Sequence, residues 1–191
     1  MSSNKVEKQT LREKVLKERS LISEATWRGS SQKIIEALQA TDFYKEAKVV
    51  HTYLSMNSRR EVATDFLIEN LFNSDKRVVV PITDFETGSL THTEIDSTSE
   101  LKVNKWGVLE PEESEEFDIS ELDLIVIPMA AAGRKGSRLG YGKGFYDRFL
   151  EKTEAKKVGL VFNVFLFDEI PTEEFDEKLD VIITEEEVIF A

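Results

Sequence analysis

The stretch LDLIVIP at residues 122–128 decides the fold of this chain. After one aspartate, four apolar residues follow without a polar face, as is typical of a strand that is covered on both sides. Such strands occur mainly in parallel sheets whose two faces are covered by helices. The stretch therefore predicts the central strand of a three-layer α/β fold.

Short strands and helices alternate on both sides of this central strand. Before it, the spacing predicts helices over 5–22, 24–38 and 64–72 and strands at 48–55 and 76–81. Residues 91–95 suggest a hairpin or an excursion. After it, we expect a helix over 144–153 and strands at 156–162, 179–185 and 187–191. This alternation predicts a single domain over residues 1–191, with a mostly parallel, open, Rossmann-like sheet flanked by helices.

The gross composition indicates one soluble domain of ordinary size. The chain has 191 residues, of which 40% are hydrophobic and 32% charged. This length and composition are sufficient for one domain with a hydrophobic core. Cysteine is absent, so disulfides and thiolate metal sites are excluded and a cytoplasmic location is expected. The N-terminal residues lack the apolar core of an export signal, and no apolar run approaches the roughly 20 residues of a membrane span. We expect no membrane partner and a monomer, with a dimer as the alternative.

Downstream of the central strand, the stretch RLGYGKGFYDRF at residues 138–149 places three glycines at alternate positions among basic residues. The net charge of the whole chain is -12, which argues against a nucleic-acid partner because phosphate binding requires a basic surface. Between Arg134 and Arg148, however, five basic residues accompany one acidic residue. This local excess of positive charge indicates that the loop binds an anion.

The glycine loop follows the predicted central strand and leads into a predicted helix, the place at which open α/β sheets bind ligands. Glycines let backbone N–H groups approach phosphate oxygens, and the helix N-terminus adds partial positive charge. Two standard phosphate-binding fingerprints fail, because Ser137, Gly144 and Phe145 occupy positions that these patterns assign to other residues. A flexible basic turn is therefore the alternative interpretation.

Two aspartates are candidates for a Mg²⁺ site. Asp147 lies just beyond the glycines, where a carboxylate can hold Mg²⁺ against a nucleoside triphosphate. Asp176 lies in the loop before the last strands, and such loops gather at one edge of a parallel sheet. From the residues alone, both could equally be solvated surface, and Asp147 could pair with Arg138 or Arg148.

Six stretches in order resemble the 5-formyltetrahydrofolate cyclo-ligase family, also called methenyltetrahydrofolate synthetases. They are LREKVL near the start, YLSMNSRREVAT, WGVLEP, LDLIVIP, KGSRLGYGKGFYDRFL and, near the end, IPTEEFDEKLDVIITE. The RLGYGKGFYD block is the specific one, and the motifs cover essentially the whole chain. The resemblance implies an ATP- and Mg²⁺-dependent enzyme that converts 5-formyltetrahydrofolate to 5,10-methenyltetrahydrofolate, ADP and phosphate through a phosphorylated formyl group.

The resemblance also implies roles for individual residues. Lys143 and Arg138 would be catalytic, with Lys143 on the transferring phosphoryl group, and Asp147 and Asp176 would hold Mg²⁺. The ATP site would comprise Lys8, Gln9, Thr10, Leu11, Arg12, Arg138, Leu139, Gly140, Tyr141, Gly142, Lys143, Gly144, Phe145 and Tyr146. The folate site would comprise Leu54, Glu61, Trp106, Tyr141, Gly142, Lys143, Gly144 and Phe145.

Several of these residues have a plainer interpretation from sequence. Lys8 and Arg12 would otherwise be solvated positions on a charged helix, and Leu54 would be ordinary core. Glu61 is expected to accept hydrogen bonds from the donor-rich pterin edge. Nothing near His51 or His92 in the sequence makes either of them a metal ligand or a base.

The chain departs from the family pattern at two places. Ala132 and Gly133 stand where the family commonly has phenylalanine and aspartate, and Phe165 stands where glutamine is common. We expect both places at the rim of the pocket, where they would bear on folate more than on ATP. Two alternatives therefore stay open: a nucleotide-binding relative with a changed substrate, and a non-enzymatic α/β binding module.

Overall fold

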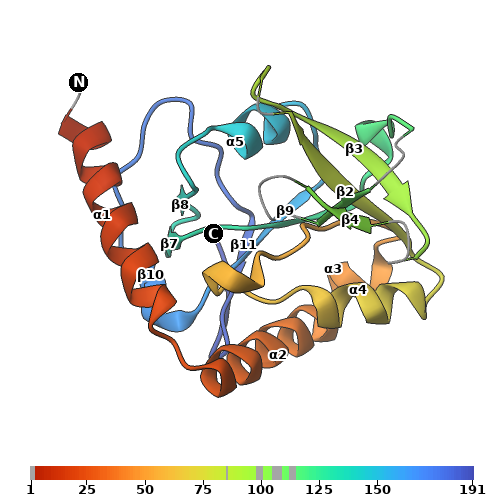
Figure 1. Ribbon diagram of the computed structural model, residues 1–191, viewed down its shortest axis with the longest axis horizontal. Coiled ribbons are helices and arrows are strands. Elements are labelled where there is room, and N and C mark those ends of the chain that lie inside the picture. Colours follow the sequence, from red (N-terminus) through yellow and green to blue (C-terminus); the bar gives the residue numbers. More distant parts are fainter. Residues whose placement is uncertain (1–2, 85, 98–100, 105–108, 112–114) are drawn as a thin grey trace.

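The computed structural model describes residues 3–84, 86–97, 101–104, 109–111 and 115–191. Its centre is a seven-stranded sheet in the order β12-β11-β9-β6-β1-β2-β3 (Figure 1). The strands are β1 Val49–His51, β2 Arg77–Asp84, β3 Ser89–Ile95, β6 Leu124–Ile127, β9 Lys156–Leu160, β11 Val181–Ile183 and β12 Val188–Phe190. Neighbouring strands from β11 to β2 are parallel, whereas β12 and β3 are antiparallel edge strands.

Strand β6 lies at the middle of this sheet, as the apolar run predicted. All four of its residues are buried, and it pairs in parallel with β1 through Val50 and Leu124 and with β9 through Val126 and Val158. The edge strand β12 is half exposed by comparison. The core is therefore centred on the stretch that lacked a polar face.

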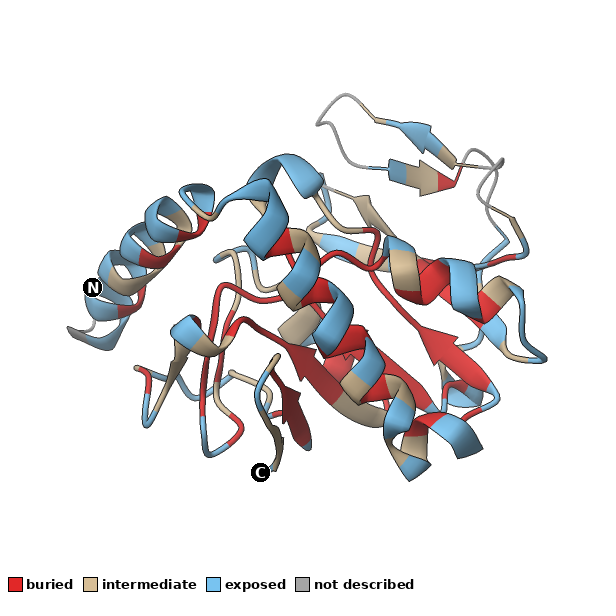
Figure 2. Ribbon diagram, turned by 90° about the horizontal axis from the view of Figure 1, so that it is seen from below, coloured by how far each residue is buried: buried red, intermediate tan, exposed pale blue. Residues whose placement is uncertain are grey.

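Helices cover both faces of the sheet, and the predicted three-layer α/β fold is confirmed. The helices are α1 Ser3–Ser20, α2 Glu24–Ala40, α3 Asp42–Glu46, α4 Asp65–Phe72 and α5 Phe145–Leu150. Helices α2 and α4 lie together on one face, while α5 packs against β3 on the other (Figures 1 and 2). Right-handed crossovers explain this division, because the crossover from β1 to β2 and the one from β6 to β9 run in opposite directions along the sheet.

Two small sheets and three short 3₁₀ helices complete the described chain. One sheet has the order β10-β7-β8, from β7 Ala131–Gly133, β8 Arg138–Leu139 and β10 Leu166–Phe167. The other pairs β4 Leu101–Val103 with β5 Leu109–Pro111. The 3₁₀ helices are η1 Asn57–Arg59, η3 Ile119–Glu121 and η4 Asn163–Phe165.

Three local predictions were wrong in detail. The glycine loop does not follow the central strand directly, because the β7–β8 hairpin intervenes and the loop continues from β8. The predicted helix over 144–153 and strand at 48–55 are shorter, at 145–150 and 49–51. Of the two alternatives for residues 91–95, the hairpin is confirmed, because they belong to β3, which pairs antiparallel with β2 over seven residue pairs.

Candidate active site

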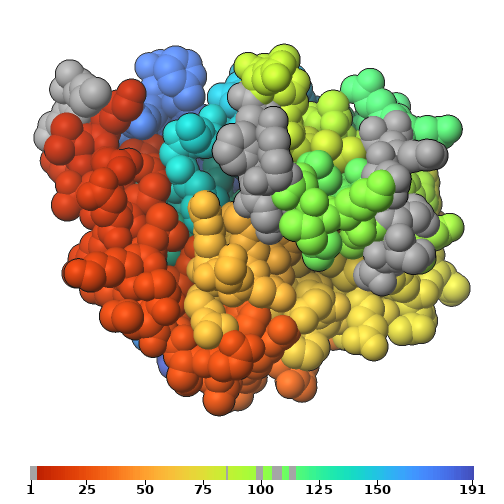
Figure 3. Space-filling model, in the orientation of Figure 1, coloured from red at the N-terminus to blue at the C-terminus, as the bar shows by residue number. Residues whose placement is uncertain are grey.

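A cleft of about 1250 Å³ opens beside the carboxyl ends of β1 and β6. Its walls come from α1, from the segment after β1, from Pro128 after β6, from the glycine loop, and from residues 173–177. In the space-filling view, α1 forms one wall, in red, beside the cyan surface of the glycine loop and α5 (Figure 3). Segments from both ends of the chain thus meet at one site.

Most of the residues assigned from sequence line this cleft. They are Lys8, Gln9, Thr10, Arg12, Leu54, Glu61, Arg138, Gly140, Tyr141, Gly142, Lys143, Gly144, Phe145, Tyr146, Asp147 and Asp176. Leu11 and Leu139 do not line it; Leu139 is fully buried and Leu11 packs against the core. Trp106 lies outside the described residues.

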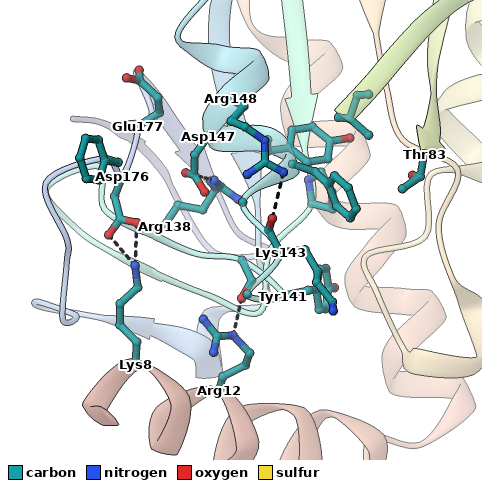
Figure 4. A pocket seen from close by; sticks show the side chains of 18 of the residues that line it. Lys8, Arg12, Thr83, Arg138, Tyr141, Lys143, Asp147, Arg148, Asp176 and Glu177 are labelled. Atoms are coloured by element: carbon teal, nitrogen blue, oxygen red, sulfur yellow. Dashed lines mark hydrogen bonds and ion pairs between the residues drawn. The ribbon is translucent and has the colours of Figure 1, made fainter. Parts of the chain in front are cut away.

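Lys8 is a buried ion-pair partner rather than a solvated surface residue. It is 7% exposed, and its Nζ lies 2.6 and 2.7 Å from the two carboxylate oxygens of Asp176. Glu173 adds a third acceptor at 3.3 Å. Asp176 in turn accepts the Glu173 backbone N–H at 2.7 Å. The plainer interpretation of Lys8 was therefore wrong, because the C-terminal loop covers this face of α1 (Figure 4).

A second ion pair in the same cleft joins Arg138 to Asp147 (Figure 4). Of the two partners that the sequence left open for Asp147, Arg138 is the one the structure shows. The Arg138 side chain is buried, and its Nε has no hydrogen-bond partner among the described residues. Both candidate metal carboxylates are thus neutralised by cations that line the same cleft.

The glycine loop is held by two arginines from outside it. Arg12 donates from Nε to the Gly140 carbonyl at 2.8 Å and lies against Gly142. Arg148 donates to the Gly88 carbonyl and, at 3.1 Å, to the Lys143 carbonyl. Gly142 and Gly144 have φ of 86° and 68°, which side-chain-bearing residues rarely adopt. With these two glycine conformations the loop lines the cleft, and the chain then continues directly into α5.

The positive charge of residues 134–148 is divided between two places. Arg134 pairs with Glu187, and Lys135 pairs with Glu169 at 2.5 Å, both outside the cleft. Of the five basic residues, Arg138, Lys143 and Arg148 line the cleft. Part of the local positive charge is therefore used in surface ion pairs, and the rest lines the cleft.

The floor of the cleft is built around Glu61. This residue is 3% exposed, and its carboxylate accepts the Met56 backbone N–H at 2.7 Å. Arg60 before it has φ of 52°, an unusual left-handed conformation that turns the chain and sends Glu61 inward. Burial raises the pKa of the Glu61 carboxyl, and this is opposed by the Tyr141 hydroxyl, the Met56 N–H and Arg19.

Arg19 stands beneath this floor and was missed by the sequence analysis. It is 2% exposed and donates to the carbonyls of Arg59 and Met129, each at 3.0 Å. Its guanidinium lies 5.4 Å from the centre of the Tyr141 ring. The sequence around it is a run of charged helix residues, so no local signal marks this arginine as buried.

Two buried tyrosine hydroxyls also face this region. Among the described residues, those of Tyr141 and Tyr146 have no partner in good hydrogen-bond geometry, although Tyr141 lies close enough to Glu61 to lower the pKa of its carboxyl. Since buried polar groups are normally paired, these hydroxyls are available to a ligand.

A pair of histidines lies behind Tyr146, although the sequence placed them apart. His51 Nε2 and His92 Nδ1 are 3.1 Å apart, on strands β1 and β3. Burial lowers the pKa of His92 to about 4 and that of His51 well below its usual range. Both imidazoles are therefore neutral at pH 7, and the pair packs against Phe149 as part of the core.

The two departures from the family pattern lie away from the cleft. Ala132 and Gly133 are buried in β7, where they pair with Leu166 and Phe167, and Phe165 is buried in the core. A Cβ on Gly133 would meet the Ser137 side chain at 2.3 Å. The expectation that these residues lie at the pocket rim was wrong, because the β7–β8 hairpin turns them away from it.

The described residues contain no group of three or more His, Cys, Asp or Glu side chains placed to hold a metal ion. Within the same part of the chain, no helix has the length and apolar character required to cross a membrane. The fold and the cleft together define a three-layer α/β protein with a highly charged cleft at the carboxyl edge of its sheet, and this cleft is lined by seven basic and seven acidic residues.

Comparison with known proteins gives the family. A model of the 5-formyltetrahydrofolate cyclo-ligase family matches residues 4–185. The 5-formyltetrahydrofolate cyclo-ligase of Escherichia coli is 34% identical over 74% of this chain and 80% of its own length. The one from Haemophilus influenzae is 28% identical over 94% and 99%. This chain therefore belongs to the 5-formyltetrahydrofolate cyclo-ligase family, as its motifs had indicated.

Solved structures agree with this family. The 5,10-methenyltetrahydrofolate synthetase of Aquifex aeolicus superposes with a TM-score of 0.85 and 32% identity, over 96% of this chain and 92% of that one. The synthetase of Mycoplasma pneumoniae shares the fold, with a TM-score of 0.74 at 24% identity over 93% and 98%.

Proposed function

We propose that this chain converts 5-formyltetrahydrofolate to 5,10-methenyltetrahydrofolate, using ATP and Mg²⁺ and releasing ADP and phosphate. Family membership and the names of the relatives support the reaction. The observation that supports the requirement for ATP and Mg²⁺ is the presence of two ion pairs in the cleft. There, Lys8 and Arg138 hold the carboxylates Asp176 and Asp147.

The chemistry of the substrate explains the need for ATP. The formyl group is an amide, and its oxygen is a poor leaving group. Transfer of the terminal phosphoryl group of ATP to this oxygen releases ADP and produces an activated imidate-like species. The nitrogen at position ten then attacks the formyl carbon, the carbon–oxygen bond breaks, and phosphate leaves with the oxygen as that nitrogen gives up its proton. The protein contributes positioning and charge neutralisation.

The cationic side of the cleft is suited to the phosphoryl transfer. Lys143 lies on the glycine loop between Gly142 and Gly144, and Arg148 holds its carbonyl. Arg138 is buried, and its Nε, beside the same loop, has no hydrogen-bond partner in the part of the chain that the structure describes. Positive charge beside the transferring group lowers the barrier where negative charge moves between oxygens. We assign Lys143 to the transferring phosphoryl group and Arg138, Lys8 and Arg12 to the remaining phosphate oxygens.

Asp147 and Asp176 are suited to Mg²⁺. The donors are hard carboxylate oxygens, and a nucleotide-bound Mg²⁺ commonly takes one or two carboxylates together with phosphate oxygens and water. A site with two protein carboxylates fits this description. When bound, the ion would neutralise charge on the polyphosphate.

The two ion pairs also imply an exchange of partners on binding. Phosphate oxygens would draw Lys8 and Arg138 away from their carboxylates, and this frees Asp176 and Asp147 for the metal. Neither ATP without Mg²⁺ nor Mg²⁺ without ATP satisfies all four groups, so we expect the complex of the two to bind more tightly than either alone.

The floor of the cleft is suited to the pterin. Glu61 presents a carboxylate in a buried setting, where unpaired polar groups on a ligand or on the protein are costly. Tyr141 offers a hydroxyl that has no partner in good geometry within the described part of the chain, and Leu54 supplies an apolar wall at 8% exposure. We assign Glu61 to the donor-rich edge of the pterin.

A direct assay tests this function. The purified protein is mixed with MgATP and 5-formyltetrahydrofolate, and the methenyl chromophore is recorded together with ADP. We expect the chromophore to form only with ATP, in a 1:1 ratio with ADP. ADP release unlinked to cyclisation would indicate a changed substrate, and absence of a thermal shift with millimolar MgATP would favour a binding module. The cytoplasmic location and the monomeric state stay predictions.

A further inference from the structure

Phe175 is an exposed aromatic residue at the mouth of the cleft. It is 84% exposed, the largest value among the exposed large hydrophobic residues of the described chain. It lines the cleft next to Asp176. An exposed phenylalanine side chain gains no free energy from burial in the folded protein. At a ligand site, such a ring is suited to contact with an apolar or aromatic part of the ligand.

The turn that carries Phe175 is held against α1 at several points. Asn4 donates from Nδ2 to the Thr172 carbonyl at 3.0 Å. The Asp176 carboxylate is bound by Lys8, and the Asp176 N–H donates to the Glu173 carbonyl at 3.1 Å. The ring is therefore presented to the cleft by a turn whose backbone is anchored on both sides of it.

The cleft has two ends on either side of its cations. Figure 4 places Lys8 and Asp176 at one end, with Arg138 and Lys143 between them and the distant Thr83. The end near Lys8 is also lined by Val6, which is 53% exposed, and by Phe175. The floor near Tyr141 contains Glu61, to which the pterin is assigned above.

A nucleotide whose phosphates occupy the central cations must extend its base toward one of these ends. The floor is assigned to the pterin, and the end near Thr83 is the space that remains for the rest of the folate. The base therefore extends toward α1 and the turn at 172–176. That end offers an aromatic face and an aliphatic side chain, the surfaces on which bases stack.

We propose that Phe175 stacks on the base of the bound nucleotide, with Val6 as the facing apolar surface. This inference rests on the proposed function, since it requires a nucleotide in the cleft. Stacking depends on the area of the ring, so a purine is favoured over a pyrimidine. Because stacking uses no hydrogen-bond pattern, Phe175 contributes affinity for the base without distinguishing one purine from another.

The test separates the base from the phosphates. Calorimetry measures binding of MgADP and of magnesium tripolyphosphate to the unsubstituted protein, Phe175→Ala and Phe175→Tyr. We expect Phe175→Ala to weaken MgADP binding about tenfold and to leave tripolyphosphate binding unchanged. Phe175→Tyr keeps the aromatic face and should restore MgADP binding.

Phe190→Ala is the matched control, because Phe190 is 70% exposed and lies outside the cleft. It should bind both ligands normally. Equal weakening of both ligands by Phe175→Ala would mean that the residue only supports the turn, and unchanged MgADP binding would place the base elsewhere. If the unsubstituted protein binds no MgADP, the proposed function and this inference are both wrong.

Discussion

The charged residues of the glycine loop and α1, here called the rim of the cleft, and those of its floor around Glu61 have different kinds of partner. At the rim, charged side chains pair with each other, as Lys8 does with Asp176 and Arg138 with Asp147. On the floor, Glu61 and Arg19 are bound by backbone groups instead: the Met56 N–H, and the carbonyls of Arg59 and Met129. Side chains paired with side chains can exchange partners when an ionic ligand arrives.

The floor, by contrast, is suited to a ligand that fits a fixed arrangement. A backbone N–H or carbonyl cannot turn away without moving the chain, so Glu61 and Arg19 keep their places with or without a ligand. A rim that exchanges ions suits a metal–polyphosphate complex, and a fixed floor suits a rigid heterocycle. Substitutions that affect one region and spare the other test this difference.

The largest effect is expected from Lys143→Ala at the rim. The substitution removes positive charge from the transferring phosphoryl group, and loss of one such stabilising group commonly lowers the rate by about 100-fold or more. Single-turnover kinetics should show this fall, while the dissociation constant of folate stays nearly the same. Lys135→Ala is the control from the same segment, since Lys135 pairs with Glu169 outside the cleft. An unchanged chemical step would remove Lys143 from the mechanism.

Asp147→Asn should have the next largest effect. It keeps the shape of the side chain but removes the charge that the metal needs, so the Mg²⁺ concentration for half-maximal turnover should rise about tenfold or more. The fold should persist with a lower free energy of unfolding, by about 1–3 kcal/mol, because buried Arg138 loses its counter-charge. Magnesium titration and thermal unfolding measure the two effects, with the exposed Asp168→Asn as control. Full activity at limiting Mg²⁺ would make Asp147 purely structural.

Glu61→Gln tests the floor. The glutamine keeps the volume and one acceptor, so folate binding should weaken by about 1–3 kcal/mol through loss of a charged hydrogen bond. MgATP affinity should stay nearly constant, because Glu61 belongs to the floor and not to the rim. Binding titrations with each ligand decide the point. If nucleotide binding weakens while folate binding is spared, the two ligands have been assigned to the wrong regions.

The smallest effect concerns the pH dependence of stability without ligands. Since burial raises the pKa of Glu61 in the folded state, the folded protein binds this proton more tightly than the unfolded chain. The contribution of Glu61 to stability therefore falls as the pH rises from its ordinary pKa to the raised one. Glu61→Gln should become more stable relative to the unsubstituted protein across that window. Unfolding curves from pH 4 to 7 that stay parallel for the two proteins would contradict the raised pKa.

The site residues divide into those with a sequence signal and those without one. The glycine loop, Arg12 and Glu61 lie in quoted motifs, and Lys8 lies three residues before the first of them. All of them line the cleft. Arg19 and the pair of His51 and His92 had no such signal, since they are isolated residues in ordinary helix and strand patterns. Trp106 lies outside the described residues, so its role as a folate contact stays a prediction.

The sequence by itself determined the buried central strand, the alternation that produces a parallel sheet, and the glycine-rich, basic character of the loop that lines the cleft. These are properties of neighbouring residues, whose spacing and side-chain volume act over a few positions. Only the tertiary structure decided that Lys8 meets Asp176, that Asp147 takes Arg138, and that the β7–β8 hairpin turns Ala132 and Gly133 from the cleft. The packing of distant segments determines which charged side chains pair. Electrostatic attraction acts between any two opposite charges, so it selects a particular pair only when the fold brings those two side chains together.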